Sequence, residues 1–160
     1  MGLNALVVCL FEESEALEHL AFKLEQEQLV LVAGKPRLLA RNSAEFEQAV
    51  TALAAVSRRR EQLVVAAAAE LGLPPTSTLS ALADAAQDED ERRVLCERRE
   101  IMRSQVGRIT DLCAKNREIL ARNLAATTDA LALLGEGPSY TAMATTTVGA
   151  PRARVLDARA

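Results

Sequence analysis

Large apolar side chains recur every seven residues along the first part of this chain. The series consists of Leu3, Leu10, Leu17, Leu24 and Leu31. Residues seven apart lie on one face of an α-helix, so the pattern predicts a long helix with a continuous apolar stripe. We expect this helix to extend from about residue 3 to residue 33. Gly34 favours a C-cap directly after it, and Pro36 cannot continue the helix.

The same spacing predicts two more long helices. The second extends from about residue 37 to residue 71, although capping residues at 42–45 leave a later start open. Its inner positions are Leu39, Phe46, Leu53, Val56, Leu63 and Ala67. The last long helix continues to about Leu134, and its series consists of Leu95, Met102 and Ile109, with Leu112 and Ile119 beside them.

Glycine and proline mark the boundaries between these helices. Residues 72–75, Gly-Leu-Pro-Pro, interrupt the helical pattern, and a short helix is expected at about 78–86, capped by Ser77 or Thr78. The acidic run at 88–91 suits the start of the last helix, where the helix dipole is positive. Residues 135–138, Gly-Glu-Gly-Pro, end it. We therefore expect a single helical domain over residues 1–134 and a flexible tail over residues 135–160.

The fold class that follows is all-α. We expect an antiparallel bundle of three long helices with coiled-coil-like packing, one short helix and a flexible C-terminal tail. The expected core consists of Leu10, Leu17, Leu24, Leu53, Val56, Leu63, Leu95, Ile109 and Leu112.

Composition narrows the functional classes. Aromatic residues make up 2% of the 160 residues and hydrophobic residues 49%, so the core must be built from Leu, Ala and Val. A net charge of −3 gives no strong field for binding nucleic acid. No stretch reaches the roughly 20 apolar residues that span a bilayer, and glutamates interrupt the N-terminal apolar run where a signal peptide would lie. We expect a cytoplasmic protein without membrane insertion.

Residues for catalysis or metal binding are scarce. His19 is the single histidine and borders an apolar stripe. The three cysteines show no zinc spacing, and we expect them to be reduced and buried or half-buried. Arg58, Arg59 and Arg60 lack neighbouring aromatics and are expected to form ion pairs rather than a nucleic-acid site. The sequence predicts no enzyme, no cofactor and no metal.

Two features of the last helix suggest a binding surface. Asn116 and Asn123 continue its apolar series. Either they fix the position of the helix in the bundle, or the stripe there is exposed and awaits a partner; the sequence leaves both open. The helix also carries more apolar surface than one bundle-facing stripe needs, which favours a client helix or a self-dimer contact. These residues are Ile119, Leu120, Leu124, Leu131 and Leu134.

The stretch 116–122, Asn-Arg-Glu-Ile-Leu-Ala-Arg, resembles the Asn-Arg-Glu-Leu-Leu stretch in the last helix of FlgN-type flagellar chaperones. Four further stretches resemble motifs of family members from high-GC Gram-positive bacteria, in the same order along the chain. They are 17–25, 34–40, 71–75 and 139–141. The resemblance covers nearly the whole chain.

The resemblance implies a helical, non-enzymatic chaperone of flagellar type III export. Its implied partners are the hook–filament junction proteins FlgK and FlgL and the cytoplasmic domain of the export gate protein FlhA. Tyr140, the single tyrosine, is the implied gate contact. The client-binding residues that it implies are Asn116, Ile119, Leu120, Asn123, Leu124, Leu131 and Leu134. The alternative is a structural coiled-coil adaptor that acts through self-association, and a homodimer is compatible with either interpretation.

Overall fold

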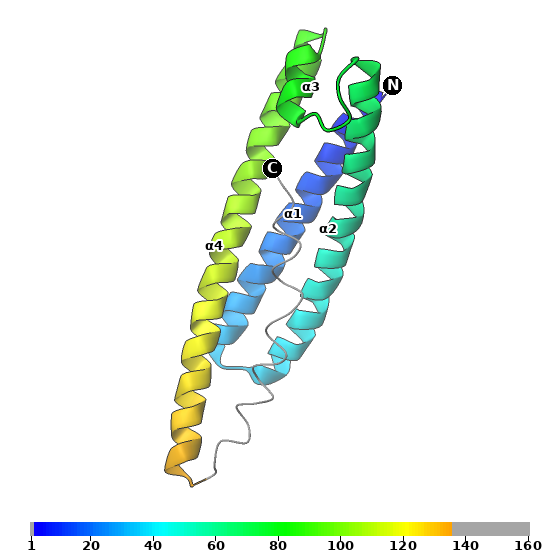
Figure 1. Ribbon diagram of the computed structural model, residues 1–160. Helices are drawn as coiled ribbons and strands as arrows, with labels where there is room; N and C mark the ends of the chain where they lie inside the picture. The colour runs from blue at the N-terminus through cyan, green and yellow to red at the C-terminus, as the bar shows by residue number, and fades with distance from the viewer. Residues whose placement is uncertain (1, 136–160) are drawn as a thin grey trace.

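The computed structural model describes residues 2–135, which form four α-helices and, within that range, no strand. The helices are α1 (Gly2–Ala33), α2 (Pro36–Glu70), α3 (Leu79–Ala85) and α4 (Glu89–Leu133) (Figure 1). This confirms the predicted all-helical bundle of three long helices and one short helix. The predicted tail lies, apart from Gly135, outside the described residues.

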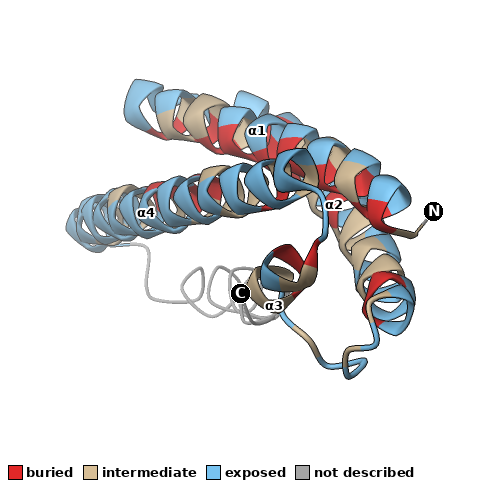
Figure 2. Cartoon of the chain, turned by 90° about the horizontal axis from the view of Figure 1, so that it is seen from above, coloured by how far each residue is buried: buried red, intermediate tan, exposed pale blue. Residues whose placement is uncertain are grey.

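Helix α1 packs against α2 on one side and against α4 on the other, and α3 packs on α4 (Figures 1 and 2). Helices α1 and α2 form an antiparallel hairpin, in which Glu70 at the end of α2 accepts hydrogen bonds from the Gly2 backbone N–H at 2.8 and 2.9 Å. Gly34 makes the tight turn between them, because its φ of 62° lies in the left-handed region. Helix α4 is antiparallel to α2 and therefore parallel to α1.

The core consists of two apolar clusters along α1. One lies where α3 covers the bundle and includes Leu6, Leu10, Leu82 and Leu95. The other lies between the middle parts of the three long helices and includes Leu17, Leu24, Phe46, Leu53 and Ile109. Buried residues line the inner sides of the helices in Figure 2.

Seven of the nine predicted core residues are buried, whereas Val56 and Leu63 are half-buried. For Leu63, the reason lies in the last turns of α2. There the buried positions are taken by the small residues Ala67 and Ala68, and Leu63 packs at the edge of their cluster. Small side chains allow α2 to approach its neighbours closely, which leaves the larger ones at the rim.

Local capping agrees with the sequence in most places. Helix α2 begins at Pro36, so the alternative start at 42–45 is wrong, and Asn42 is instead buried. Thr78 rather than Ser77 caps α3, because its Oγ1 accepts from the Ala81 N–H at 3.2 Å. Asp88 caps α4 by accepting from the Asp90 N–H at 2.9 Å, and acidic residues fill the first turn as expected.

The three cysteines form no disulfide with one another, and they differ in exposure. Cys9 is buried and Cys113 half-buried, but Cys96 is exposed, so the prediction of three buried or half-buried thiols is wrong for Cys96. Burial raises the pKa of the Cys9 thiol, which keeps it protonated and unreactive.

Candidate functional site

Helix α4 extends beyond the end of the α1–α2 hairpin. The Asn123 side-chain amide donates to the Leu31 carbonyl at 3.0 Å, two residues before α1 ends at Ala33. Helix α4 continues from Asn123 to Leu133 for roughly 15 Å, and its last turns lie beyond the end of the hairpin (Figure 1). Every residue from 121 to 135 is exposed or half-buried. We call residues 124–134 the overhang.

Exposed apolar side chains gather at this end of the molecule. Leu133 is 89% exposed, and Leu29 and Val32 in the last turns of α1 are each 71% exposed. Of the ten large hydrophobic residues that are exposed in the described chain, six lie on the overhang or at the hairpin end. Such a concentration marks an interaction surface rather than the scattered exposure of ordinary surfaces. We define the distal surface as Leu29, Val32, Leu38, Leu124, Leu131, Leu133 and Leu134.

The predicted client-binding leucines fall on one line along this surface. Leu124 and Leu131 are seven residues apart, and Leu120 and Leu134 border the same face of α4. Leu124 and Leu134 are exposed, whereas Ile119, Leu120 and Leu131 are half-buried. The structure thus brings the predicted leucines together on the overhang and on the turn before it.

The two asparagines belong to the interface with α1. The Asn116 side-chain amide is 3% exposed and donates to the Leu24 carbonyl at 2.9 Å and to Glu27 Oε2 at 3.0 Å. Asn123 makes the equivalent bond to Leu31 one heptad later. Of the two alternatives that the sequence left open, these bonds favour the one in which the asparagines fix the position of the helix.

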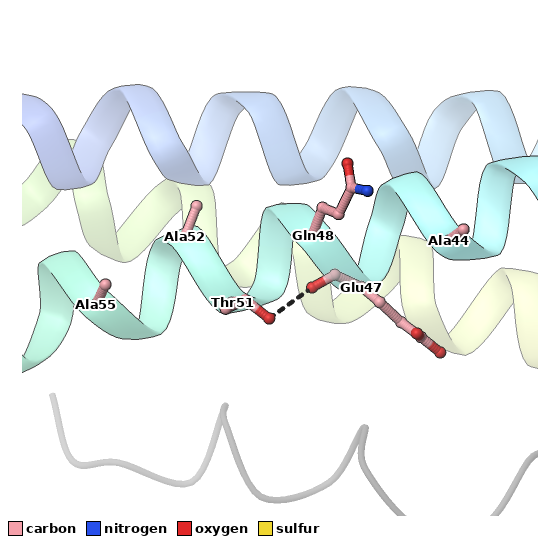
Figure 3. Close-up of a pocket in the computed structure, with 6 residues that line it drawn as sticks. All are labelled: Ala44, Glu47, Gln48, Thr51, Ala52 and Ala55. Carbon is pink, nitrogen blue, oxygen red and sulfur yellow. Dashed lines mark hydrogen bonds between the residues drawn. The ribbon is translucent and has the colours of Figure 1, made fainter.

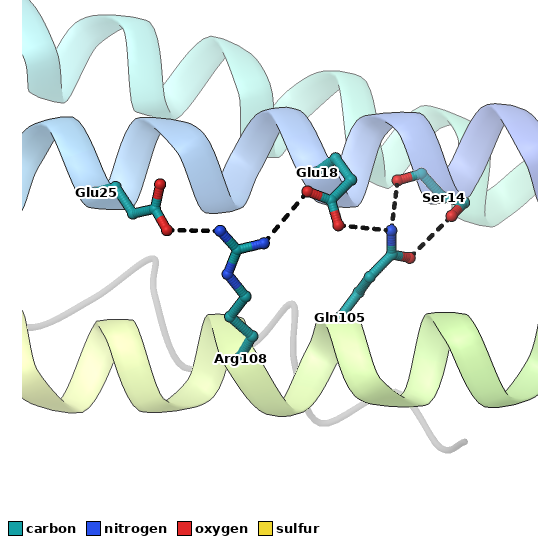
Figure 4. A network of polar contacts seen from close by, with 5 residues as sticks. All are labelled: Ser14, Glu18, Glu25, Gln105 and Arg108. Atoms are coloured by element: carbon teal, nitrogen blue, oxygen red, sulfur yellow. Dashed lines mark hydrogen bonds and ion pairs between the residues drawn. The ribbon is translucent and has the colours of Figure 1, made fainter.

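A polar network further along the same interface also holds α4 in place (Figure 4). Gln105 accepts from the Ser14 hydroxyl at 2.9 Å and donates to the Ser14 carbonyl at 3.2 Å and to Glu18 at 3.0 Å. Arg108 bridges Glu18 and Glu25 at 3.3 and 2.6 Å, and these carboxylates raise the pKa of its guanidinium. The bonded residues follow the same order along α1 and α4, so these hydrogen bonds can all form in only one register of the two helices. That register determines how far α4 extends beyond the hairpin.

Sequence reasoning missed Leu29, Val32 and Leu38 as members of the distal surface. Leu29 and Val32 lie outside the seven-residue series, which passes through Leu31 instead. The signal was present in the run 29–32, Leu-Val-Leu-Val, because four consecutive apolar residues surround a helix and cannot all face one core.

The arginine run on α2 serves the hairpin. Arg59 pairs with Glu12 at 2.6 Å and Arg60 with Glu13 at 2.7 Å. The expected ion pairs are therefore confirmed for two of the three arginines, while Arg58 is exposed and forms no salt bridge with the residues that the structure describes.

The structure has a surface depression on helix α2. The depression on the outer face of α2 is lined by exposed residues of that one helix, where the Thr51 hydroxyl donates to the Glu47 carbonyl at 3.0 Å (Figure 3). Its lining consists of Ala44, Glu47, Gln48, Thr51, Ala52 and Ala55. Among residues 2–135, no three His, Cys, Asp or Glu side chains lie together in a way that could hold a metal ion. No helix in the same range is long and apolar enough to cross a bilayer.

Comparison with known proteins identifies the family of this chain. A sequence model described as FlgN protein matches residues 1–144, which include all four helices and the overhang. No match was found among curated proteins or solved structures. FlgN proteins are flagellar export chaperones, a family not known for enzymatic activity, and they bind hook-associated proteins. The match covers nine-tenths of the sequence, including all four helices. This chain therefore belongs to the FlgN family.

Proposed function

We propose that this protein binds the C-terminal helical segments of FlgK and FlgL at the distal surface. In this proposal it keeps both clients unassembled in the cytoplasm and delivers them to the flagellar export gate. The observation that carries the proposal is the overhang, where α4 presents leucines without a neighbouring helix to cover them.

An amphipathic client helix fits this arrangement. Its apolar face would lie along Leu120, Leu124 and Leu131, which recur at spacings that a second helix can match. Covering one exposed leucine contributes about 1.5–3 kcal/mol, whereas association costs at least about 4 kcal/mol. Several leucines must therefore be covered at once. Leu29 and Val32 at the hairpin end would widen the contact beyond α4 itself.

Replacing Leu124 and Leu131 together with Asp should abolish binding of FlgK and FlgL C-terminal peptides. The reason is that two carboxylates would have to be desolvated in the interface. Both positions are outside the two core clusters, so the helical circular dichroism should not change. Calorimetric titration measures the affinity.

Val65→Asp is the matched control, because Val65 is a 48% exposed apolar residue on α2, away from the overhang. It should leave client affinity unchanged. Full affinity in the Leu124/Leu131 double variant would place the client site elsewhere on the molecule.

Delivery to the gate is assigned to Tyr140 and the segment after Leu134. Tyr140 lies outside the described residues, and its role rests on the family resemblance. Tyr140→Ala and truncation after Leu134 should both reduce binding to the FlhA cytoplasmic domain in the presence of client, because an aromatic anchor is lost. Client affinity should stay nearly unchanged in a parallel titration. A collapse of client binding on truncation would assign the tail to the client site instead.

Self-association through the same leucines is the second candidate, and the exposed apolar area at the distal surface favours it. Sedimentation analysis of the free protein distinguishes the two. A homodimer that persists when saturating client peptide is added would show that the clients use another surface.

A further inference from the structure

Positive charge gathers at the distal end of this acidic chain. Residues 29–44 contain three basic residues and no acidic one. Residues 112–135 on α4 contain three basic and two acidic residues. These two segments together carry a net charge of +4, although the whole chain carries −3.

Four of these cations form no salt bridge with the residues that the structure describes. Glu118 is paired with Arg122 at 2.7 Å, and Arg41 is paired with Glu45 at 3.1 Å. The remaining cations form no salt bridge with any residue in the range 2–135, and all are exposed. We call them the distal cations: Lys35, Arg37, Lys115 and Arg117.

Arg117 connects this charge to the apolar surface. It lies seven residues before Leu124 and fourteen before Leu131, so it stands on the same line of α4 as the overhang leucines. A helix that lies along those leucines and continues toward the bundle would reach the Arg117 guanidinium where its apolar face ends. Lys35 lies in the turn between α1 and α2, and Arg37 lies in the first turn of α2. They follow Val32 by three and five residues.

We propose that the segment held at the distal surface is an amphipathic helix with acidic side chains bordering its apolar face. This inference rests on the proposed client-binding function and adds the charge of the client. Carboxylates on the client's edge would pair with cations that form no salt bridge with the described residues and would speed association by steering. A second copy of this chain fits less well, because a symmetric contact there brings two positive clusters together.

Two synthetic helical peptides with an identical Leu face test the proposal. One carries Glu at the positions that border this face, and the other carries Lys. In titrations of the full chain at low salt, the Glu peptide should bind roughly tenfold more tightly than the Lys peptide. The difference should shrink at about 1 M salt, where the Debye length falls to roughly 3 Å.

Arg117→Glu should weaken binding of the Glu peptide by roughly three- to tenfold, because it replaces a favourable exposed pair with a repulsive one. Arg103→Glu is the matched control. Arg103 is exposed, has no salt bridge within the described range, and lies on the same line of α4, fourteen residues and roughly 21 Å before Arg117. This control should leave the affinity unchanged.

The outcomes separate this inference from the function on which it rests. Equal binding of both peptides at every salt concentration overturns the charge inference, even if the Leu124/Leu131 double variant still loses FlgK and FlgL. Failure of the FlgK and FlgL segments to bind the intact protein overturns the proposed function. Co-sedimentation with phosphatidylglycerol vesicles, without binding of the Glu peptide, would show that the cations serve an anionic lipid surface and would overturn the inference.

Discussion

Polar side chains inside the bundle tie α1 to both of its neighbours. Glu13 accepts from the Ser57 hydroxyl at 2.7 Å and pairs with Arg60 of α2, while Gln105 and Asn116 of α4 reach carbonyl groups of α1. A buried polar group is costly unless it is paired, so each of these residues penalises any other register of the helices. These residues therefore fix the relative positions of the helices as well as stabilise the bundle. On α4 they determine where the overhang begins.

Asn116→Ala should lower the free energy of unfolding by about 1–3 kcal/mol, because it removes the donors to Leu24 and Glu27 and leaves the buried Glu27 carboxylate with one hydrogen bond fewer. Urea denaturation measures this change. Asn123→Ala removes a similar bond to a backbone carbonyl at a more exposed position and should cost less. Equal losses for the two variants would show that burial does not set the contribution of these amides.

At the scale of elements, the hairpin and α4 have different roles. Helices α1 and α2 are of similar length and cover each other from end to end, with ion pairs along their sides. Helix α4 has 45 residues, and the α1–α2 hairpin covers only part of it. The hairpin therefore acts as the support, and the surplus of α4 is the part free to meet a partner.

The ion pairs along the hairpin make its stability depend on pH. The Lys23 ammonium donates to the Glu45 carboxylate at 2.7 Å, and the Arg41 guanidinium donates to the same carboxylate at 3.1 Å. Both hydrogen bonds lower the pKa of the Glu45 carboxyl below its ordinary value of 4.5. A depressed folded-state pKa contributes stability above the unfolded-state pKa, and this contribution is lost as the pH falls through the folded-state value.

Glu45→Gln should therefore lower the thermal midpoint at pH 7, and the difference from the unmodified protein should shrink as the pH is lowered below 4.5 toward 3. Calorimetric scans across this range measure it. Glu47→Gln, on the exposed face of α2 without a salt bridge among the described residues, is the control and should show little difference at either pH. A difference for Glu45→Gln that persists undiminished at pH 3 would mean that the charge of Glu45 is not its source.

For the whole molecule, the core and the distal surface are separable. The core clusters lie between α1, α2, α3 and the part of α4 before residue 113, with no member on the overhang. In the function proposed above, another chain covers the distal surface, and the charge around this surface selects which chain binds. A molecule built this way can bind and release a client without repacking its core.

Truncation after Asn123 should leave the fold intact, with a thermal midpoint within a few degrees of the full chain, because residues 124–135 are exposed or half-buried and belong to neither core cluster. Binding of FlgK and FlgL peptides should be lost. Truncation after Leu134 is the comparison that keeps the overhang, and it should bind both. If truncation after Asn123 abolishes the cooperative unfolding transition, the overhang is needed for folding and the separation is wrong.

The sequence by itself determined the helices. Their stops before Gly34 and Gly72, the acidic first turn of α4 and the seven-residue series follow from backbone geometry and side-chain spacing, which are local properties. The all-helical bundle, most of its core and the family could be predicted for the same reason. The sequence also showed that α4 has more leucines than one bundle-facing stripe needs. Apolar positions on one helix can be counted without knowing which helices lie beside it.

Only the tertiary structure decided which of these side chains are covered. Asn116 is buried while Leu124 is exposed, although both lie on the inner half of one helix, because Asn116 contacts the body of α1 and Leu124 lies near the level where α1 ends. Leu29 and Val32 are exposed because they lie outside the face of α1 that buries Leu31, and Leu63 lies at the edge of a cluster in which α2 contributes buried alanines. Burial depends on how far each partner helix reaches. That reach is fixed by contacts between residues about ninety positions apart, such as Ser14 with Gln105, which no local pattern contains.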